Sequence, residues 1–138
     1  ADLLAYAALR GAFWSDSPQR PIDWISSALL TNQTPPSWYD FARGFTQLAA
    51  GNAESALPFL NRTRDAITSG LYGATALRQL GKTREALGVI SDLSVRAPYF
   101  DLDLHLRAMG AEASLLGDEL RATYEDLVVR RRKILSGR

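Results

Sequence analysis

The sequence predicts an all-α protein, and three observations lead to that prediction. Apolar residues recur at helical spacing along almost the whole chain. Strand signals are nearly absent, because no alternating run of valine, isoleucine and threonine extends beyond a few residues. Gly51, Gly81 and Gly117 each divide two helical segments, at intervals of 30 and 36 residues. A repeating unit of that size is typical of stacked helix pairs, since one helical hairpin cannot bury its own apolar face.

We expect one domain of about eight helices, grouped in four segments. Segment 1–34 is an N-terminal helix pair, and the polar, Pro-containing run at its end is the strongest break in the chain. Segments 35–66, 67–100 and 101–138 are three repeats, the last of them a C-terminal cap. The helices are expected at 2–13, 21–30, 37–50, 52–64, 68–80, 83–96, 101–116 and 118–135.

Glycine and proline justify the ends of these helices. Pro21 can open the second helix, because its missing N–H costs nothing in a first turn. Gly51 and Gly81 can supply the left-handed residue that helix C-termini favour. In the last segment we expect the same of Gly117, with Asp118 as the N-cap of the final helix.

The composition excludes several classes of function. The 138 residues are 46% hydrophobic and 22% charged, which suits one domain with one core. A net charge of +1 does not indicate a nucleic-acid or anionic-membrane partner. No apolar run approaches the roughly 18 residues of a membrane-crossing helix, so we expect no membrane insertion. Because cysteine is absent, disulfides, thiolate catalysis and cysteine-bound metals are excluded.

No group of residues indicates catalysis, a metal site or a cofactor. The chain has no Gly-rich phosphate loop ending in Lys-Ser/Thr and no Gly-x-Ser-x-Gly sequence. His105 is the only histidine, so we expect it on a partly solvated helix face. The basic run from Arg130 to Lys133 lies near a helix C-terminus, where cations offset the helix dipole. We therefore expect no enzyme activity, no cofactor and no nucleic-acid binding.

The middle repeat resembles a known family. Its small residues lie where two helices of a hairpin approach closely, and its larger apolar residues lie where hairpins stack. The matching residues are Ala74, Leu77, Gly81, Ala86, Ile90, Leu93 and Pro98. This pattern resembles the tetratricopeptide repeat, over about residues 37–135 and most strongly at 67–100. In the last repeat Asp126 stands where a large apolar residue belongs, which fits a terminal capping repeat with a wetter outer face.

The resemblance implies a right-handed superhelix of about three antiparallel helix hairpins after the N-terminal pair. It also implies a concave groove, lined by the first helix of each hairpin, that binds a peptide or an amphipathic helix of a partner. The expected partner-binding residues are Tyr39, Thr46, Leu71, Thr75, Arg78, Gln79, Arg107 and Ser114. The groove does not resemble the carboxylate clamp of chaperone-binding tetratricopeptide domains, which needs Lys and Asn in place of Leu71 and Thr75.

We interpret the chain as a non-enzymatic protein–protein interaction module, an adaptor or assembly scaffold. One alternative is a bacterial chaperone of the type III secretion kind, which would hold a helical subunit in the groove. Another is a repeat region of a larger assembly. An all-α enzyme and a self-associating homo-oligomer are less favoured alternatives. The expected compartment is the cytoplasm, with the periplasm or an envelope assembly left open.

The aromatic residues of the N-terminal pair form a separate feature. Phe13, Trp14 and Trp24 flank a polar loop that contains Pro18. We expect them to pack the first two helices against Trp38. An exposed Trp14 would instead mark a second contact site or a dimer interface.

Overall fold

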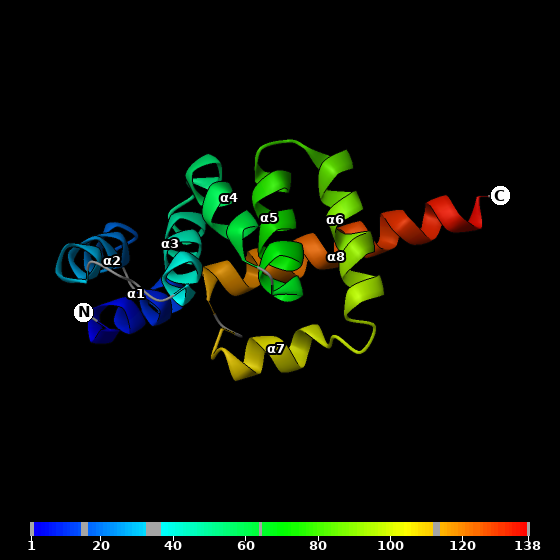
Figure 1. Ribbon diagram of the computed structural model, residues 1–138. Helices are drawn as coiled ribbons and strands as arrows, with labels where there is room; N and C mark the ends of the chain where they lie inside the picture. The colour runs from blue at the N-terminus through cyan, green and yellow to red at the C-terminus, as the bar shows by residue number, and fades with distance from the viewer. Residues whose placement is uncertain (1, 15–16, 33–36, 64, 112–113, 138) are drawn as a thin grey trace.

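The computed structural model describes residues 2–14, 17–32, 37–63, 65–111 and 114–137, which form helices joined by turns (Figure 1). Within these residues the helices are α1 (Asp2–Trp14), α2 (Gln19–Thr31), α3 (Trp38–Ala49), α4 (Ala53–Arg62), the π-helical turn η1 (Thr68–Tyr72), α5 (Gly73–Gln79), α6 (Thr83–Arg96), α7 (Leu102–Ala108) and α8 (Leu115–Ser136). No strand occurs among them, so the predicted all-α class is confirmed.

The first six α-helices form three consecutive hairpins. Helix α1 packs along α2, α3 along α4, and α5 along α6. The hairpins also stack on one another, because α3 contacts both α1 and α2 while α5 contacts α4. Figure 1 shows α3, α4, α5 and α6 as a row of upright helices. Neighbouring hairpins thus cover part of one another's apolar surface.

Two of these hairpins turn at the predicted glycines. Gly51 and Gly81 have φ angles of +82° and +76°, a left-handed conformation that glycine adopts without steric cost. In both turns the N–H of the residue after the glycine donates to a carbonyl five residues earlier, which satisfies the end of the helix. These bonds run from Asn52 to Gln47 and from Lys82 to Leu77, each at 2.9 Å.

The third turn of this kind lies at Gly110, so the prediction that Gly117 divides the last two helices is wrong. Gly110 has a φ of +65°, and the N–H of Ala111 donates to the carbonyl of Leu106 at 2.8 Å. Helix α7 therefore ends at Ala108 and not near residue 116. The spacing from Gly81 to Gly110 is 29 residues, close to the 30 residues between Gly51 and Gly81.

Gly117 lies inside α8, where it is buried. The N-cap of α8 is Ser114 and not Asp118, because the Ser114 Oγ accepts a hydrogen bond from the Gly117 N–H at 2.9 Å. A Cβ atom at position 117 would overlap the carbonyl oxygen of Ala111. Glycine is therefore required here for close packing against the preceding turn and not for a left-handed conformation.

Helix α8 does not form a hairpin with α7. It runs across the row of hairpins and contacts α1, α3, η1, α5 and α6 (Figure 1). Its buried stripe consists of Leu116, Leu120, Thr123 and Leu127, at the spacing of four, three and four residues that keeps one helix face inward. The three leucines belong to the main apolar core of the molecule, while a smaller core joins α1, α2 and the start of α3.

Two glycine-to-alanine substitutions should have opposite effects on stability. Gly117→Ala should lower the free energy of unfolding by about 2 kcal/mol, because the methyl group collides with backbone that cannot move freely. Gly88→Ala should raise it by about 0.5–1 kcal/mol, because Gly88 lies within α6 and its Cβ would meet no atom within 4 Å. Urea unfolding followed by circular dichroism measures both, and a Gly117→Ala chain as stable as wild type would contradict the packing described here.

Candidate partner-binding surface

Part of the surface expected to receive a partner, in the middle repeat, is covered by α8. We define the α8-binding face as the parts of α1, α3, η1, α5 and α6 that contact α8. The first helix of each of the three hairpins takes part in this face. In the middle repeat, one of the chain's own helices therefore lies against the elements that were expected to bind a partner.

In the first predicted repeat, Tyr39 and Thr46 are buried and face away from any partner. Tyr39 belongs to the small core between α1, α2 and α3, and its hydroxyl donates to the Asp2 carboxylate at 2.6 Å. The Thr46 hydroxyl donates to the carbonyl of Arg43 at 3.0 Å. Both are covered because the α1–α2 hairpin stacks on α3, which the weak N-terminal match to the family did not indicate.

In the middle repeat, Leu71 and Thr75 are fully buried. Leu71 lies in the same apolar core as Leu120 and Leu127 of α8. The Thr75 hydroxyl donates to the carbonyl of Leu71 at 2.9 Å, so it is satisfied within its own helix. In this conformation neither side chain is accessible to a second protein.

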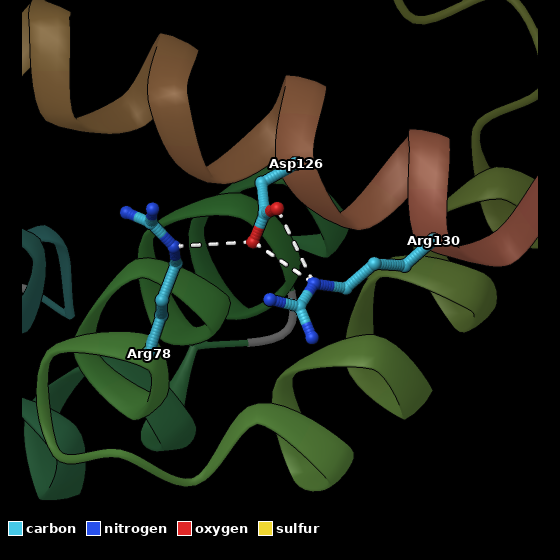
Figure 2. Close-up of polar contacts among 3 residues, drawn as sticks. All are labelled: Arg78, Asp126 and Arg130. Carbon is cyan, nitrogen blue, oxygen red and sulfur yellow. Dashed lines mark hydrogen bonds and ion pairs between the residues drawn. The ribbon is translucent and has the colours of Figure 1, made fainter.

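Arg78 makes its contact with α8. Its Nε lies 3.5 Å from an Asp126 carboxylate oxygen, and Figure 2 shows that carboxylate between the Arg78 and Arg130 side chains. The Arg130 Nε donates to both carboxylate oxygens at 3.2 Å. Arg78 and Asp126 are each about one third exposed (35% and 33%), so solvent weakens the pair to about 1 kcal/mol or less. The polar residue that departs from the family pattern, Asp126, thus pairs with a predicted partner-binding residue.

The remaining predicted residues are divided between surface and core. Gln79 and Arg107 are exposed, at the end of α5 and on α7. Ser114 is buried because its hydroxyl caps α8. Of the eight predicted residues the structure therefore buries Tyr39, Thr46, Leu71, Thr75 and Ser114, and it brings only Arg78 into a charged contact with α8.

A continuous row of aromatic rings, which the sequence did not reveal, links the hairpins to α7 and α8. Phe45 stacks on Tyr72 at 4.0 Å between ring centroids, and Phe13 meets the edge of Phe45 at 6.1 Å. The row continues from Tyr72 to His105, then to Phe100 and to Tyr124 of α8, each step at 5.7–5.8 Å. Rings in such contacts add to the energy of burial. The row joins α1, α3, η1, α7 and α8, elements that lie far apart in the sequence.

His105 is partly buried within this row, as a member of a hydrogen-bonded pair. The Tyr72 hydroxyl and the His105 Nε2 lie 2.8 Å apart. Burial lowers the pKa of His105 from 6.5, and the negative charge of Asp65 opposes that shift. Burial also raises the pKa of Tyr72. The pair is therefore neutral near pH 7, and its surroundings of aromatic rings explain both shifts.

The N-terminal aromatic residues are divided between core and surface. Phe13 is buried against Phe45, while Trp24 and Trp38 lie at the edge of the small core. Trp14 is 55% exposed and, with the 86% exposed Leu115, borders a hollow of about 410 Å³ where α1 meets the start of α8. The sequence analysis expected a second contact site or a dimer interface if Trp14 were exposed, and the structure exposes it.

Comparisons with known proteins do not extend this description. No family model, no curated protein and no solved structure matches the chain. Across the described ranges, no three His, Cys, Asp or Glu side chains are grouped so that they could hold a metal ion. None of the described helices combines the length and the apolar character needed to cross a membrane.

The His105–Tyr72 pair predicts a pH dependence of stability. Because the folded chain lowers the pKa of His105, the unfolded chain binds a proton more readily. The stability that the neutral His105 side chain contributes to the folded chain is fully present above pH 6.5. It is lost as the pH falls below 6.5 and through the lower pKa of the folded chain. Urea unfolding at pH 7.5 and pH 5.5 should show wild type losing more stability than His105→Gln. His105 is the only histidine, so equal losses would contradict the neutral pair.

Proposed function

We propose that this chain is a non-enzymatic protein–protein interaction module, an adaptor or assembly scaffold that binds an amphipathic helix of a partner on the α8-binding face. The observation that carries this proposal is that the face already holds such a helix, α8. Its apolar stripe is buried from Leu116 to Leu127, and its charged residues lie at the edge or in solvent. Helix-in-groove binding uses the same anchors, at intervals of three and four residues.

The resemblance to the tetratricopeptide repeat remains part of this proposal. The glycine turns at Gly51 and Gly81, and the small residues Ala74 and Ala86 buried between α5 and α6, support it for residues 37–100. The last segment supports it less, because α8 crosses the hairpins in place of pairing with α7. A partner's helix would accordingly take the place of α8 and not lie beside it.

Replacement of α8 by a partner's helix depends on the free energy with which α8 binds its own chain. Three fully buried leucines contribute about 2 kcal/mol each, and the covalent tether gives α8 a local concentration in the millimolar range. Two features weaken its hold. The Arg78–Asp126 pair is one third exposed and therefore adds little, and the buried Thr123 hydroxyl has no hydrogen-bond partner among the described residues. An unsatisfied buried hydroxyl costs about 1–3 kcal/mol.

The test uses a fluorescent peptide of residues 114–137 as a surrogate partner helix, added to the full-length chain. Asp126→Arg should bind this peptide at least about tenfold more tightly than wild type, because Arg78 then repels the chain's own α8 and attracts the peptide's Asp126. Thr123→Val should bind it more weakly than wild type, since removal of the unpaired hydroxyl stabilises α8 in place. Fluorescence anisotropy measures the three affinities.

Glu125→Arg is the matched control. It makes the same change of charge on α8, on an exposed side chain whose only ion pair with the described residues is the 3.9 Å contact with Arg121. Its affinity for the peptide should equal that of wild type. If no variant binds the peptide, or if the control gains as much as Asp126→Arg, the α8-binding face is not a receptor for helices in trans.

A further inference from the structure

Helix α8 continues beyond the hairpins that it crosses. Figure 1 shows its last turns extending past α6 toward the C-terminus. The inward stripe that buries Leu127 continues at the same spacing to Arg131 and Ile134. Ile134 is 58% exposed and the adjacent Leu135 is 53% exposed, because none of the described helices lies over them. The apolar face of α8 is therefore longer than the surface that covers it.

A pocket opens between this projecting end and α6. We call it the overhang pocket, and its volume is about 430 Å³. Its lining residues are Thr83, Arg84, Leu87, Arg130, Lys133 and Ile134. Nearly all of its accessible lining is carbon, although three of the six residues are cations. The aliphatic stems of Arg84, Arg130 and Lys133 therefore form its walls, an arrangement in which the charged ends reach water.

The charge around the overhang pocket is positive and largely uncompensated. Arg130 shares Asp126 with Arg78, whereas Arg84 and Lys133 form no ion pair with any residue that the structure describes. Arg131 and Arg132 add two further cations to the same turns of α8. The whole chain has a net charge of only +1, so this cluster is a local excess. An apolar pocket bordered by unpaired cations is complementary to apolar side chains flanked by carboxylates.

We propose that the overhang pocket binds an amphipathic helix of a partner protein that carries acidic residues on both sides of its apolar stripe. Apolar side chains of the partner contact Leu87 and Ile134, and its carboxylates pair with Arg84 and Lys133. This inference rests on the proposed function, because in both the ligand is an amphipathic helix of a partner. It differs in the site, because the pocket exists only while α8 is in place, so the acidic helix binds without displacing α8.

Two other occupants fit the observations less well. A second copy of the chain, placed by twofold symmetry, would bring Arg130, Arg132 and Lys133 toward their own equivalents, which like-charge repulsion opposes. A nucleic acid would pair with the cations but would leave the apolar lining, Leu87 and Ile134, without contacts. Self-association and binding to anionic lipid are accordingly outcomes that the experiment must detect.

The experiment measures binding of a helical peptide of about four turns, with leucine at helical spacing and glutamate beside it, to the full chain. Wild type should bind this peptide, and more weakly as salt is raised. Ile134→Ser and the double variant Arg84→Glu, Lys133→Glu should each weaken binding by about tenfold or more. Both changes lie on exposed side chains, so the variants should keep the wild-type circular dichroism and melting.

Matched controls separate the pocket from general effects. Arg20→Glu reverses an exposed charge on α2, and Val95→Ser removes an exposed apolar side chain of α6 outside the pocket. Both should bind the acidic peptide as wild type does. A peptide with lysine for every glutamate should not bind. Equal binding of the acidic peptide to all variants would overturn the proposal.

A label at position 115 distinguishes this proposal from the exchange of α8. The chain has no cysteine, so Leu115→Cys provides a single labelling site beside Trp14 in the same hollow. Binding in the overhang pocket should leave the energy transfer from tryptophan to this label unchanged. If the transfer falls while the pocket variants still bind, the peptide has replaced α8, which refutes the overhang site and supports the proposed function.

The remaining outcomes also decide the question. If the acidic peptide fails to bind while the 114–137 peptide binds Asp126→Arg, the overhang proposal fails and the proposed function stands. Binding of vesicles that contain phosphatidylserine, lost in the same pocket variants and without binding of the peptide, would assign the surface to anionic lipid. Light scattering that shows a dimer lost in Ile134→Ser would assign it to self-association.

Discussion

The fold depends on the burial of one leucine stripe, formed by Leu116, Leu120 and Leu127 of α8. The three hairpins contact one another mainly as neighbours, and a row of hairpins leaves apolar surface open along one side. Helix α8 covers that side from α1 to α6 and thereby closes the main apolar core. Ser114 and Gly117 make this possible, because the cap and the missing Cβ allow α8 to begin directly against the turn at Ala111.

The charged contacts of α8 have a different role from its leucines. The apolar stripe supplies most of the energy, while the carboxylate of Asp126, held between Arg78 of α5 and Arg130 of its own helix, fixes where α8 lies relative to α5 (Figure 2). Exposed ion pairs contribute little stability but disfavour wrong alignments. The row of rings from Phe13 to Tyr124 does the same within the core, since edge and stacked contacts require defined orientations. Both features make one placement of α8 preferable to a shift along its axis.

The sequence predicted what depends on local chemistry and missed what depends on distant contacts. The helices around Gly51 and Gly81 were predictable because glycine, apolar spacing and turn length act within about ten residues. Gly117 was wrongly predicted to divide the last two helices, because the residues around it resemble those around Gly51 and Gly81. Its actual role depends on its close contact with Ala111. Tyr39, Thr46, Leu71 and Thr75 were expected in an open groove. Nothing in the helical spacing indicates that the α1–α2 hairpin covers Tyr39 and Thr46, or that α8 packs on the core around Leu71. The Tyr72–His105 pair likewise joins elements 33 residues apart.

The contact between α1 and α8 joins the first and last helices that the structure describes. In a simple repeat array each unit touches only its neighbours, so folding can begin anywhere and spread along the array. Here the core is complete only when residues near the C-terminal end reach helices near the N-terminal end, which raises the contact order and slows folding. During synthesis on the ribosome, the hairpins emerge before the helix that covers them. Their apolar side then stays open to chaperones and to aggregation until α8 has been made.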